Sequence, residues 1–196
     1  MFLSQLRLNP RQRQVQRDLG SPYEMHRTLW RAFGDRRDRV LYRVDAEDGQ
    51  SPPVVLVQSA EEPDWTAVDD GNGYLIDAAS KEISLALRAG QPLRFRLRAN
   101  PTVYRDGRRL AIQTPDDQLA WLDRQLGKAG AQTLSATVTR SFRQTTRPGP
   151  NPQIHQVADY DGVLRVAEPD RLISAVDSGI GRAKAYGCGL VVLARA

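Results

Sequence analysis

The stretch G-S-P-Y-E-M-H-R-T-L-W-R-A-F-G, residues 20–34, predicts a helix with marked ends, and the rest of the chain is interpreted around it. Ser21 suits the N-cap, Pro22 suits the first helical position, and Glu24 completes the pattern of a capping box. Gly34 suits the position just past the end. At ~100° per residue the helix has one apolar stripe, formed by Pro22, Met25, Leu29, Ala32 and Phe33.

One edge of this stripe carries Tyr23, His26 and Trp30. His26 lies in the first helical turns, near free backbone N–H groups and the positive end of the helix dipole. This position disfavours the imidazolium form and attracts anions such as phosphate, which suits general-base chemistry on a ribose hydroxyl. The alternative is a half-buried histidine beside a core stripe, and spacing alone favours it because one histidine and one tyrosine form a weak motif.

The segments around this helix predict a strand-helix-strand-strand order. Alternating or continuous apolar residues predict strands over 2–8, 40–46 and 54–60. The polar stretch 11–19 is interpreted as a short helical turn or, preferably, a solvated basic surface. Residues 36–39 and 47–53 are expected to form turns, 74–76 a short strand, and 81–87 a second helical turn. This half fits the ferredoxin-like plan incompletely.

The second half predicts the same order more completely. Strands are expected over 92–99, 133–139 and 190–194, helices over 115–130 and 170–178, and hairpins around Asp106-Gly107 and Asp161-Gly162. In the strand over 92–99, leucine and phenylalanine alternate with arginine, which predicts a half-buried strand with a basic outer face. We therefore predict an α+β chain of two tandem ferredoxin-like domains, residues 1–88 and 89–196.

Positive charge is concentrated in the second half. Residues 1–90 carry 12 Lys+Arg and 14 Asp+Glu, a net charge of −2, whereas residues 91–196 carry 16 and 9, a net charge of +7. Nearly all of these cations are arginines, whose guanidinium forks suit phosphate and guanine edges. A nucleic-acid partner is the resulting expectation. A genome that favours arginine would explain the preference over lysine but not the asymmetry.

The remaining composition predicts a soluble cytoplasmic protein without a metal centre. Cys188 is the single cysteine, which excludes an internal disulfide and a cysteine-based zinc cluster and suits a reducing compartment. The N-terminus lacks a long apolar region, and no stretch approaches the ~20 apolar residues of a membrane span. Trp65 and Trp121 are expected in the core, and His155 at a strand surface.

The segment S-G-I-G-R-A-K-A-Y-G-C-G-L, residues 178–190, fits neither of the common phosphate-binding fingerprints. It contains no G-x-x-x-x-G-K-[ST], and its glycines lack the spacing and the preceding strand of a dinucleotide site. Its four glycines would let backbone approach backbone or a phosphate closely. By itself this predicts tight packing or anion contact.

Taken together, these motifs identify the chain as similar to a known family. The glycine pattern near the C-terminus, on a duplicated ferredoxin-like plan, resembles repeat-associated RNA-binding proteins of CRISPR systems. The stretches F-L-S-Q-L-R-L-N-P (2–10) and P-Y-E-M-H-R-T-L (22–29) resemble the CasE-type endoribonucleases of the type I-E system. So do P-P-V-V-L-V-Q-S (52–59), E-P-D-W (62–65) and R-F-R-L-R-A-N-P (94–101). The resemblance covers nearly the whole length.

The resemblance implies a metal-independent endoribonuclease that needs no cofactor. Such enzymes cut precursor CRISPR RNA at the base of the repeat stem-loop by attack of a 2′-OH, leaving a 2′,3′-cyclic phosphate and a 5′-OH. The product then stays bound, with the enzyme a subunit of the Cascade complex. By position, His26 would be the general acid or base and Tyr23 would assist. Arg31 stands where relatives often have lysine; it could stabilise phosphate charge but, with a pKa above ~12, cannot readily transfer a proton.

RNA contacts are expected from the second half, because an A-form stem is recognised mainly through its phosphates and 2′-hydroxyls. The candidates are Arg94, Arg96, Arg98, Arg140, Arg143, Arg147, Gly179, Gly181, Arg182 and Lys184. The arginines at 140, 143 and 147 are expected on a loop that contacts the RNA backbone. Two alternatives stay open: a crRNA-binding subunit of the same complex that does not cleave, and a nucleotide- or metabolite-binding ferredoxin-like domain, which the basic second half disfavours.

Overall fold

The computed structural model describes residues 1–35, 39–45, 51–147, 149 and 151–196, which group into two units. The first unit contains Met1–Ser84, together with Ala185–Gly187 and the described residues between Thr146 and Pro152. The second unit contains the rest, from Leu85 onward. The domain boundary predicted after residue 88 stays a prediction.

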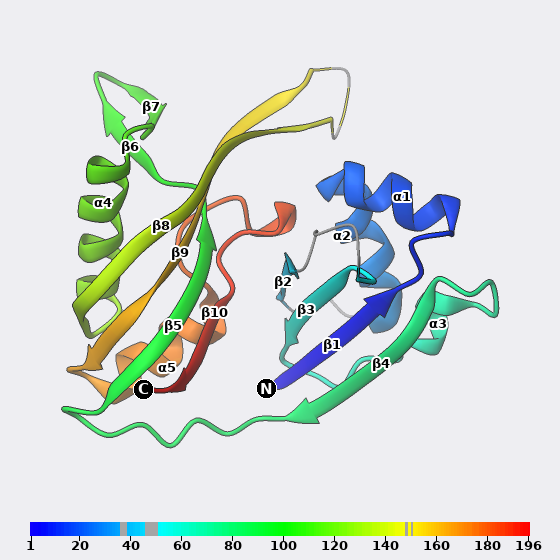
Figure 1. Cartoon of the computed structure of the whole chain (residues 1–196), viewed down its shortest axis with the longest axis horizontal. Helices are drawn as coiled ribbons and strands as arrows, with labels where there is room; N and C mark the ends of the chain where they lie inside the picture. Colours follow the sequence, from blue (N-terminus) through cyan, green and yellow to red (C-terminus); the bar gives the residue numbers. More distant parts are fainter. Residues whose placement is uncertain (36–38, 46–50, 148, 150) are drawn as a thin grey trace. The chain divides into compact units, whose positions relative to one another are not determined.

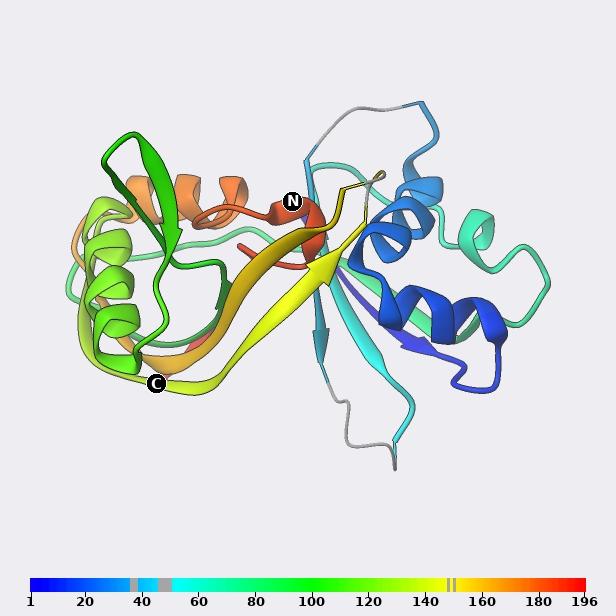
Figure 2. The same ribbon diagram turned by 90° about the horizontal axis from the view of Figure 1, so that it is seen from above.

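The first unit is a four-stranded sheet with helices on one face (Figures 1 and 2). Along the chain its elements are β1 (Phe2–Leu8), α1 (Arg13–Gly20), α2 (Pro22–Trp30), the 3₁₀ helix η1 (Arg31–Phe33), β2 (Val40–Asp45), β3 (Val54–Ser59), α3 (Thr66–Asp69) and β4 (Leu75–Glu82). The strand order is β2-β3-β1-β4, with β1 antiparallel to β3 and β4 and β2 antiparallel to β3. This order is that of a ferredoxin-like sheet.

The start of α2 forms as predicted, with one difference. The Ser21 hydroxyl accepts a hydrogen bond from the Glu24 backbone N–H at 3.4 Å, and Pro22 takes the first helical position. In a complete capping box the Glu24 carboxylate would accept a hydrogen bond from the Ser21 backbone N–H. Here that N–H donates to the Asp18 carbonyl oxygen at 3.2 Å. The Glu24 carboxylate pairs instead with Arg27 at 3.3 Å. Gly34 follows η1 with a φ of 58°, a positive value that glycine adopts without a steric cost.

Residues 11–19 fit both interpretations of the sequence in part. Arg11, Arg13 and Arg17 are exposed, as predicted for a solvated basic surface, but the stretch is helical and also contributes to the core. Most of this stretch lies in α1, which buries Val15 and Asp18. The Asp18 carboxylate accepts hydrogen bonds from the Thr28 hydroxyl at 2.7 Å and the Tyr74 hydroxyl at 3.0 Å. A buried carboxylate is tolerated only when its oxygens are satisfied in this way. Asp18 therefore fixes α1 against α2.

The strand predicted over 74–76 is present but extends much further, and the prediction of a helical turn over 81–87 is wrong. β4 runs through Leu75–Glu82, and residues 83–88 form no helix. Backbone pairing with β1 extends from Leu8↔Leu75 to Phe2↔Glu82, so an exposed, polar edge strand forms without apolar alternation. The helix between β3 and β4 is the short α3. The turns predicted at 36–39 and 47–53 fall mostly on 36–38 and 46–50, outside the described residues.

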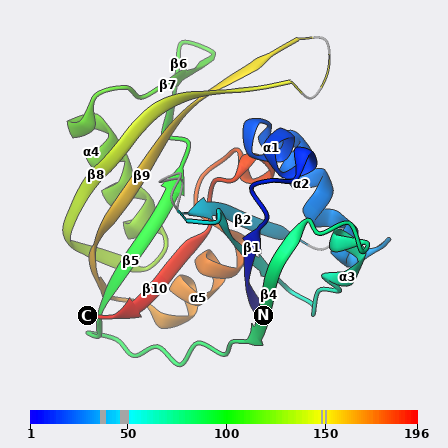
Figure 3. The same ribbon diagram turned by 45° about the vertical axis from the view of Figure 1, so that its right-hand side comes forward.

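The second unit repeats the plan and carries an inserted hairpin (Figures 1 and 3). Its elements are β5 (Pro92–Ala99), β6 (Thr102–Arg105), β7 (Arg108–Ala111), α4 (Pro115–Lys128), β8 (Ala131–Thr146), β9 (Gln153–Val166), α5 (Pro169–Ser178) and β10 (Val191–Arg195). The main sheet has the order β10-β5-β9-β8, and β6 and β7 pair separately. Both main sheets thus place the first strand between the third and the fourth, which confirms two ferredoxin-like domains.

The prediction of a hairpin at Asp161-Gly162 is wrong, because it took Gly162 for a turn residue. β9 passes straight through this dipeptide as one strand of 14 residues. A Cβ atom on Gly162 would lie 2.2 Å from the Ser135 carbonyl oxygen and 2.8 Å from the Phe95 ring. Gly162 is therefore a close-packing position within the sheet and not a turn residue. The hairpin connects β8 and β9, and β8 is much longer than the predicted 133–139.

The core of each unit contains the predicted tryptophan. Trp65 packs in the first core with Met25, Leu29 and Phe33. Trp121 of α4 stacks on Tyr160 of β9 with ring centroids 6.2 Å apart. The expectation for both tryptophans is thus confirmed. Within the described ranges, no helix is long and apolar enough to cross a membrane.

Candidate active site and basic sheet face

His26 lies on α2 between two aromatic side chains. The Trp30 indole N–H donates a hydrogen bond to His26 Nε2 at 2.7 Å, with the ring centroids 5.6 Å apart. Tyr42, from β2, lies on another side with its ring centroid at 6.4 Å. Positions 26 and 30 are one helical turn apart and so share a face. The imidazole is therefore held by its own helix and by the adjoining sheet.

Burial keeps the His26 imidazole neutral. His26 is half-buried, and its removal from water lowers its pKa below the ordinary value of 6.5. Burial disfavours the charged form because the imidazolium loses hydration that the protein does not replace. Near neutral pH the ring can therefore accept a proton, which is the requirement for a general base.

Tyr42 is fixed in place beside His26. Its hydroxyl donates a hydrogen bond to the Pro22 carbonyl oxygen in the first turn of α2 at 2.7 Å. Gly187, which groups with the first unit, lies against the same ring: a Cβ atom there would be 3.2 Å from Tyr42 Cε2. Gly187 also has a φ of 79°, so both space and backbone require glycine. At this glycine the prediction of tight packing is confirmed.

The other two predicted catalytic residues have partners of their own. The guanidinium of Arg27 lies over the Tyr23 ring, 5.9 Å from its centroid. Arg31 forms an ion pair with Asp70 at 3.2 Å, and the Asp70 side chain is 73% exposed. Among the described residues no hydrogen bond, ion pair or ring contact joins His26 to Tyr23 or Arg31. An exposed pair of this kind is weak, so a phosphate could displace Asp70 from Arg31.

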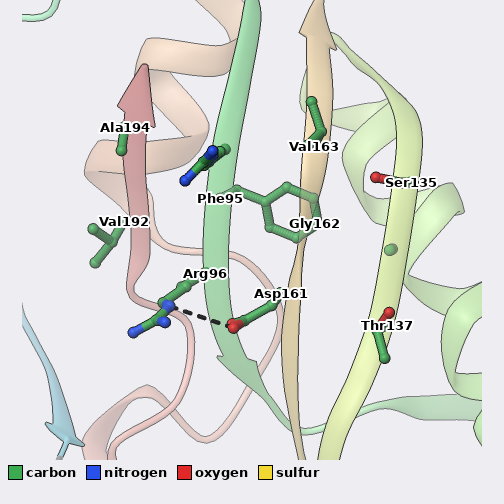
Figure 4. Close-up of a pocket in the computed structure, with 11 residues that line it drawn as sticks. Phe95, Arg96, Ser135, Thr137, Asp161, Gly162, Val163, Val192 and Ala194 are labelled. Carbon is green, nitrogen blue, oxygen red and sulfur yellow. Dashed lines mark ion pairs between the residues drawn. The ribbon is translucent and has the colours of Figure 1, made fainter. Parts of the chain in front are cut away.

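In the second unit, the β5 arginines lie on the sheet face opposite the buried one. Leu93, Phe95 and Leu97 are at most 4% exposed, so the alternating Arg94, Arg96 and Arg98 point the other way. A depression of about 490 Å³ on this face is lined by Arg94, Arg96, Asp161, Ser135, Thr137 and Val192 among others. Figure 4 shows the ion pair of Arg96 with Asp161 in this depression. The predicted basic outer face of this strand is confirmed.

The three β5 arginines differ in how available they are. Arg98 makes two hydrogen bonds to the Asp159 carboxylate, at 2.6 and 2.9 Å, and only 14% of its side chain is exposed. Arg96 is 64% exposed and forms a longer pair with Asp161 at 3.4 Å. Arg94 is exposed and lies opposite Val163 of β9 in the register. Availability to a ligand therefore decreases from Arg94 to Arg98.

The arginines predicted on a loop after residue 139 lie mostly on a strand. Arg140 and Arg143 belong to β8, and Arg147 follows its end. Arg140 lies 4.4 Å from the centroid of the Phe142 ring, a cation–π contact. Arg143 and Arg147 are exposed. The loop interpretation fails for Arg140 and Arg143 because β8 continues to Thr146 beside β9.

In the glycine segment, Gly179 and Gly181 have φ values of 74° and 83°, and Arg182 is exposed. A Cβ atom on Gly181 would lie 3.2 Å from the Trp121 ring, so this glycine too serves close packing. The Lys184 ammonium donates to the Ser178 carbonyl at 2.6 Å and helps to close the loop.

Neither metal ligation nor thiol chemistry is indicated in the described ranges. No group of three or more His, Cys, Asp or Glu side chains there is placed to hold a metal ion. Cys188 is fully buried, which raises the pKa of its thiol to about 12. A thiol with so high a pKa is a poor nucleophile.

The sequence placed Trp30 beside His26 on one edge of the helix but did not show the hydrogen bond between them. Two further partners were missed: Tyr42 beside His26, and Asp70 beside Arg31. The Trp30 contact had a signal, since i and i+4 positions on a helix are neighbours. Tyr42 comes from β2 and Asp70 from the end of α3. Both are distant from α2 in the sequence, so no local pattern predicts these contacts.

The fold and these sites define a class: a basic α+β protein of two ferredoxin-like domains, with a helix-borne histidine in one and an arginine-lined sheet face in the other. A family model described as CRISPR associated protein matches residues 1–195. The chain is 38% identical to the CRISPR-associated endoribonuclease Cse3 of Thermus thermophilus, over 99% of this chain and 100% of that protein. It is 32% identical to the CRISPR system Cascade subunit CasE of Escherichia coli K12, over 88% and 91%.

A solved structure gives the same result. The structure of Thermus thermophilus Cse3 bound to an RNA representing a pre-cleavage complex aligns with a TM-score of 0.91 at 38% identity, over 98% of both chains. The chain belongs to the CasE/Cse3 family of CRISPR-associated proteins.

Proposed function

We propose that this protein is a metal-independent endoribonuclease that cleaves precursor CRISPR RNA at the base of the repeat stem-loop and stays bound to the mature crRNA as a Cascade subunit, in the cytoplasm. The observation that carries the proposal is His26: a half-buried, neutral imidazole on a capped helix, in a chain 38% identical to an endoribonuclease. The Cascade role rests on the likeness to the Cascade subunit CasE.

His26 would transfer the proton. A ribose 2′-OH attacks the adjacent phosphorus, the bond from phosphorus to the 5′ oxygen breaks, and the products are a 2′,3′-cyclic phosphate and a 5′-OH. The imidazole either takes the proton from the 2′-OH or, once protonated, gives one to the departing 5′ oxygen. Its low pKa favours the base role near neutral pH.

Tyr23 and Arg31 would act on the phosphate around this step. Tyr23 lies one turn before His26 on α2 and is partly exposed, so its hydroxyl can hydrogen-bond a reacting group. Arg31 would exchange Asp70 for a phosphate oxygen and stabilise the charge that develops there. It would not transfer a proton, because the pKa of arginine exceeds ~12.

The second unit would hold the RNA. Arg94 and Arg96 on the open sheet face, Arg143 and Arg147 along β8, and Arg182 are exposed and suit phosphate contacts. Arg98 and Lys184 already have short contacts to Asp159 and the Ser178 carbonyl, so their roles would be to shape the surface. Gly179 and Gly181 would admit close approach of the RNA backbone, and Arg140 would contact RNA from its position over Phe142.

The test is cleavage of a labelled repeat hairpin in EDTA under single-turnover conditions. His26→Ala should lower the rate by at least ~100-fold, as expected for loss of a general acid or base, with hairpin binding retained. His155→Ala is the matched control because it removes the other histidine, half-buried on β9 in the second unit. It should cleave like the wild type.

The products and the binding distinguish the alternatives. One cut at the stem base with a cyclic-phosphate end, lost in His26→Ala alone, is the expected result. Tight binding without cutting by the wild type would favour the non-cleaving crRNA-binding subunit. Absence of hairpin binding would reject both RNA functions and leave a small-molecule-binding domain.

A further inference from the structure

The hydrogen bond between Trp30 and His26 determines where the imidazole carries its proton as well as how the ring is oriented. An indole N–H can only donate, so His26 Nε2, 2.7 Å away, must present its lone pair. A neutral imidazole carries one proton, which must then lie on Nδ1. The contact therefore selects one of the two neutral tautomers of His26.

We propose that Trp30 is a positioning residue for His26: its indole N–H occupies Nε2 and holds the imidazole in the neutral tautomer that carries its proton on Nδ1. For catalysis this inference rests on the proposed function. For the tautomer it stands on the contact alone.

The surrounding rings keep the indole aimed at Nε2. Phe33 packs edge-on against Trp30, with centroids 6.5 Å apart and planes at 69°. Phe33 in turn packs edge-on against buried Trp65 at 6.0 Å. The indole is thus braced by a row of aromatic side chains that ends in the core, and such packing limits its rotamers.

In the described part of the chain, the His26 imidazole forms no ion pair, and its hydrogen bond comes from Trp30. From β2, the titratable Tyr42 faces His26, but its hydroxyl donates to the Pro22 carbonyl. On α2 itself, Glu24 and Arg27 pair with each other at 3.3 Å. The tautomer of His26 is therefore set by the indole.

This tautomer determines which imidazole nitrogen takes part in the reaction. With Nδ1 protonated, Nε2 is the nitrogen that can accept the 2′-OH proton, and Trp30 must release it when RNA binds. If His26 acts as the acid instead, Nε2–H of the imidazolium gives its proton to the 5′ oxygen, which restores the tautomer that Trp30 favours. In either role Nδ1 keeps its proton while Nε2 exchanges one.

The experiment is NMR of the full-length protein with ¹⁵N-labelled histidine. Long-range ¹H–¹⁵N spectra distinguish the Nδ1–H tautomer from the Nε2–H tautomer, and with two histidines in the chain His155 serves as internal reference. The variant is Trp30→Phe, which keeps a ring and removes the donor. The matched control is Trp121→Phe, which also replaces an indole by a phenyl ring but lies in the second unit, stacked on Tyr160.

In the wild type we expect His26 to be mainly in the Nδ1–H form above its pKa. Trp30→Phe should shift the population toward Nε2–H and raise the pKa of His26 by about 1 pH unit, since protonation no longer costs a hydrogen bond. Trp121→Phe should change neither quantity. A wild type mainly in the Nε2–H form, or a tautomer ratio unchanged in Trp30→Phe, would overturn the proposal.

Activity provides a second readout. Cleavage at subsaturating enzyme follows the pKa values of the free protein, in which Trp30 still contacts Nε2. Its pH profile should therefore move to higher pH in Trp30→Phe, together with the pKa of His26, with hairpin binding retained. A shifted tautomer with an unshifted pH profile would reject the catalytic part of the inference. If the wild type does not cleave at all, the proposed function fails, while the NMR result still decides the tautomer. Thermal melts confirm that each variant is folded, and the wild-type spectrum is decisive without any variant.

Discussion

At the scale of the residue, His26 is controlled by burial and by one donor. Partial burial lowers the pKa of the imidazole, and the Trp30 indole already donates a hydrogen bond to its Nε2. Both effects favour the neutral form. The neutral ring can accept a proton from a ligand, but its imidazolium form is unfavourable in the free protein.

This state predicts a pH-dependent stability. Below the ordinary value of 6.5, the unfolded chain binds a proton that the folded His26 rejects. The free energy of unfolding should therefore fall as the pH drops from 6.5 through the lowered pKa, and should be unaffected by His26 above 6.5. Urea unfolding of the wild type and His26→Gln at pH 7.5, 6 and 5 measures this. The variant should lose less stability on acidification, with a residual loss from His155, whose pKa burial also lowers. An equal loss of unfolding free energy on acidification in the wild type and in His26→Gln would contradict this prediction.

At the scale of the element, glycine has opposite roles in a strand and in a helix. Gly162 in β9 leaves no room for a side chain because the Ser135 carbonyl and the Phe95 ring close over it. Gly127 in α4 has no atom within 4 Å of a built Cβ. The first position requires glycine for packing, whereas the second only weakens its helix.

The two glycines give a matched pair of variants. Gly162→Ala should destabilise the protein by about 3 kcal/mol, because backbone of β8 must move to admit the methyl group. Gly127→Ala should stabilise it by about 0.5–1 kcal/mol, because alanine restricts the unfolded chain and favours helix. Denaturant unfolding measures both. Equal stability of the two variants would show that the sheet adjusts freely at Gly162.

At the scale of the whole molecule, the charge is divided between the two halves of the chain. The net charge of +7 over residues 91–196 contrasts with −2 over residues 1–90. Part of the positive charge is neutralised within the fold, as in the Arg98–Asp159 pair. The exposed arginines that remain for a polyanion include those on β5, β8 and the glycine segment, besides Arg105, Arg108 and Arg109 of the β6–β7 hairpin.

Hairpin binding should therefore depend steeply on salt, through residues that can be chosen from the structure. Arg94→Gln should weaken binding and reduce the slope of log K against log [salt] by about 1, the loss of one phosphate contact. Arg171→Gln is the control, since Arg171 already binds the Glu168 carboxylate and the Lys128 carbonyl on the helical side. It should leave the slope unchanged. A slope that Arg94→Gln does not alter would remove Arg94 from the RNA surface.

The sequence by itself determined what depends on neighbours along the chain. The cap of α2 at Ser21, the alternation of β5, the tryptophans of the cores and the family resemblance were all predicted from local patterns, and the order of elements indicated two ferredoxin-like halves. Only the tertiary structure decided that Gly162 lies inside a strand, that β4 pairs along β1, and that Tyr42 and Asp70 are partners of His26 and Arg31. The physical reason is that capping and periodicity act within a few residues, whereas pairing, close packing and ion pairs join residues that the chain keeps far apart.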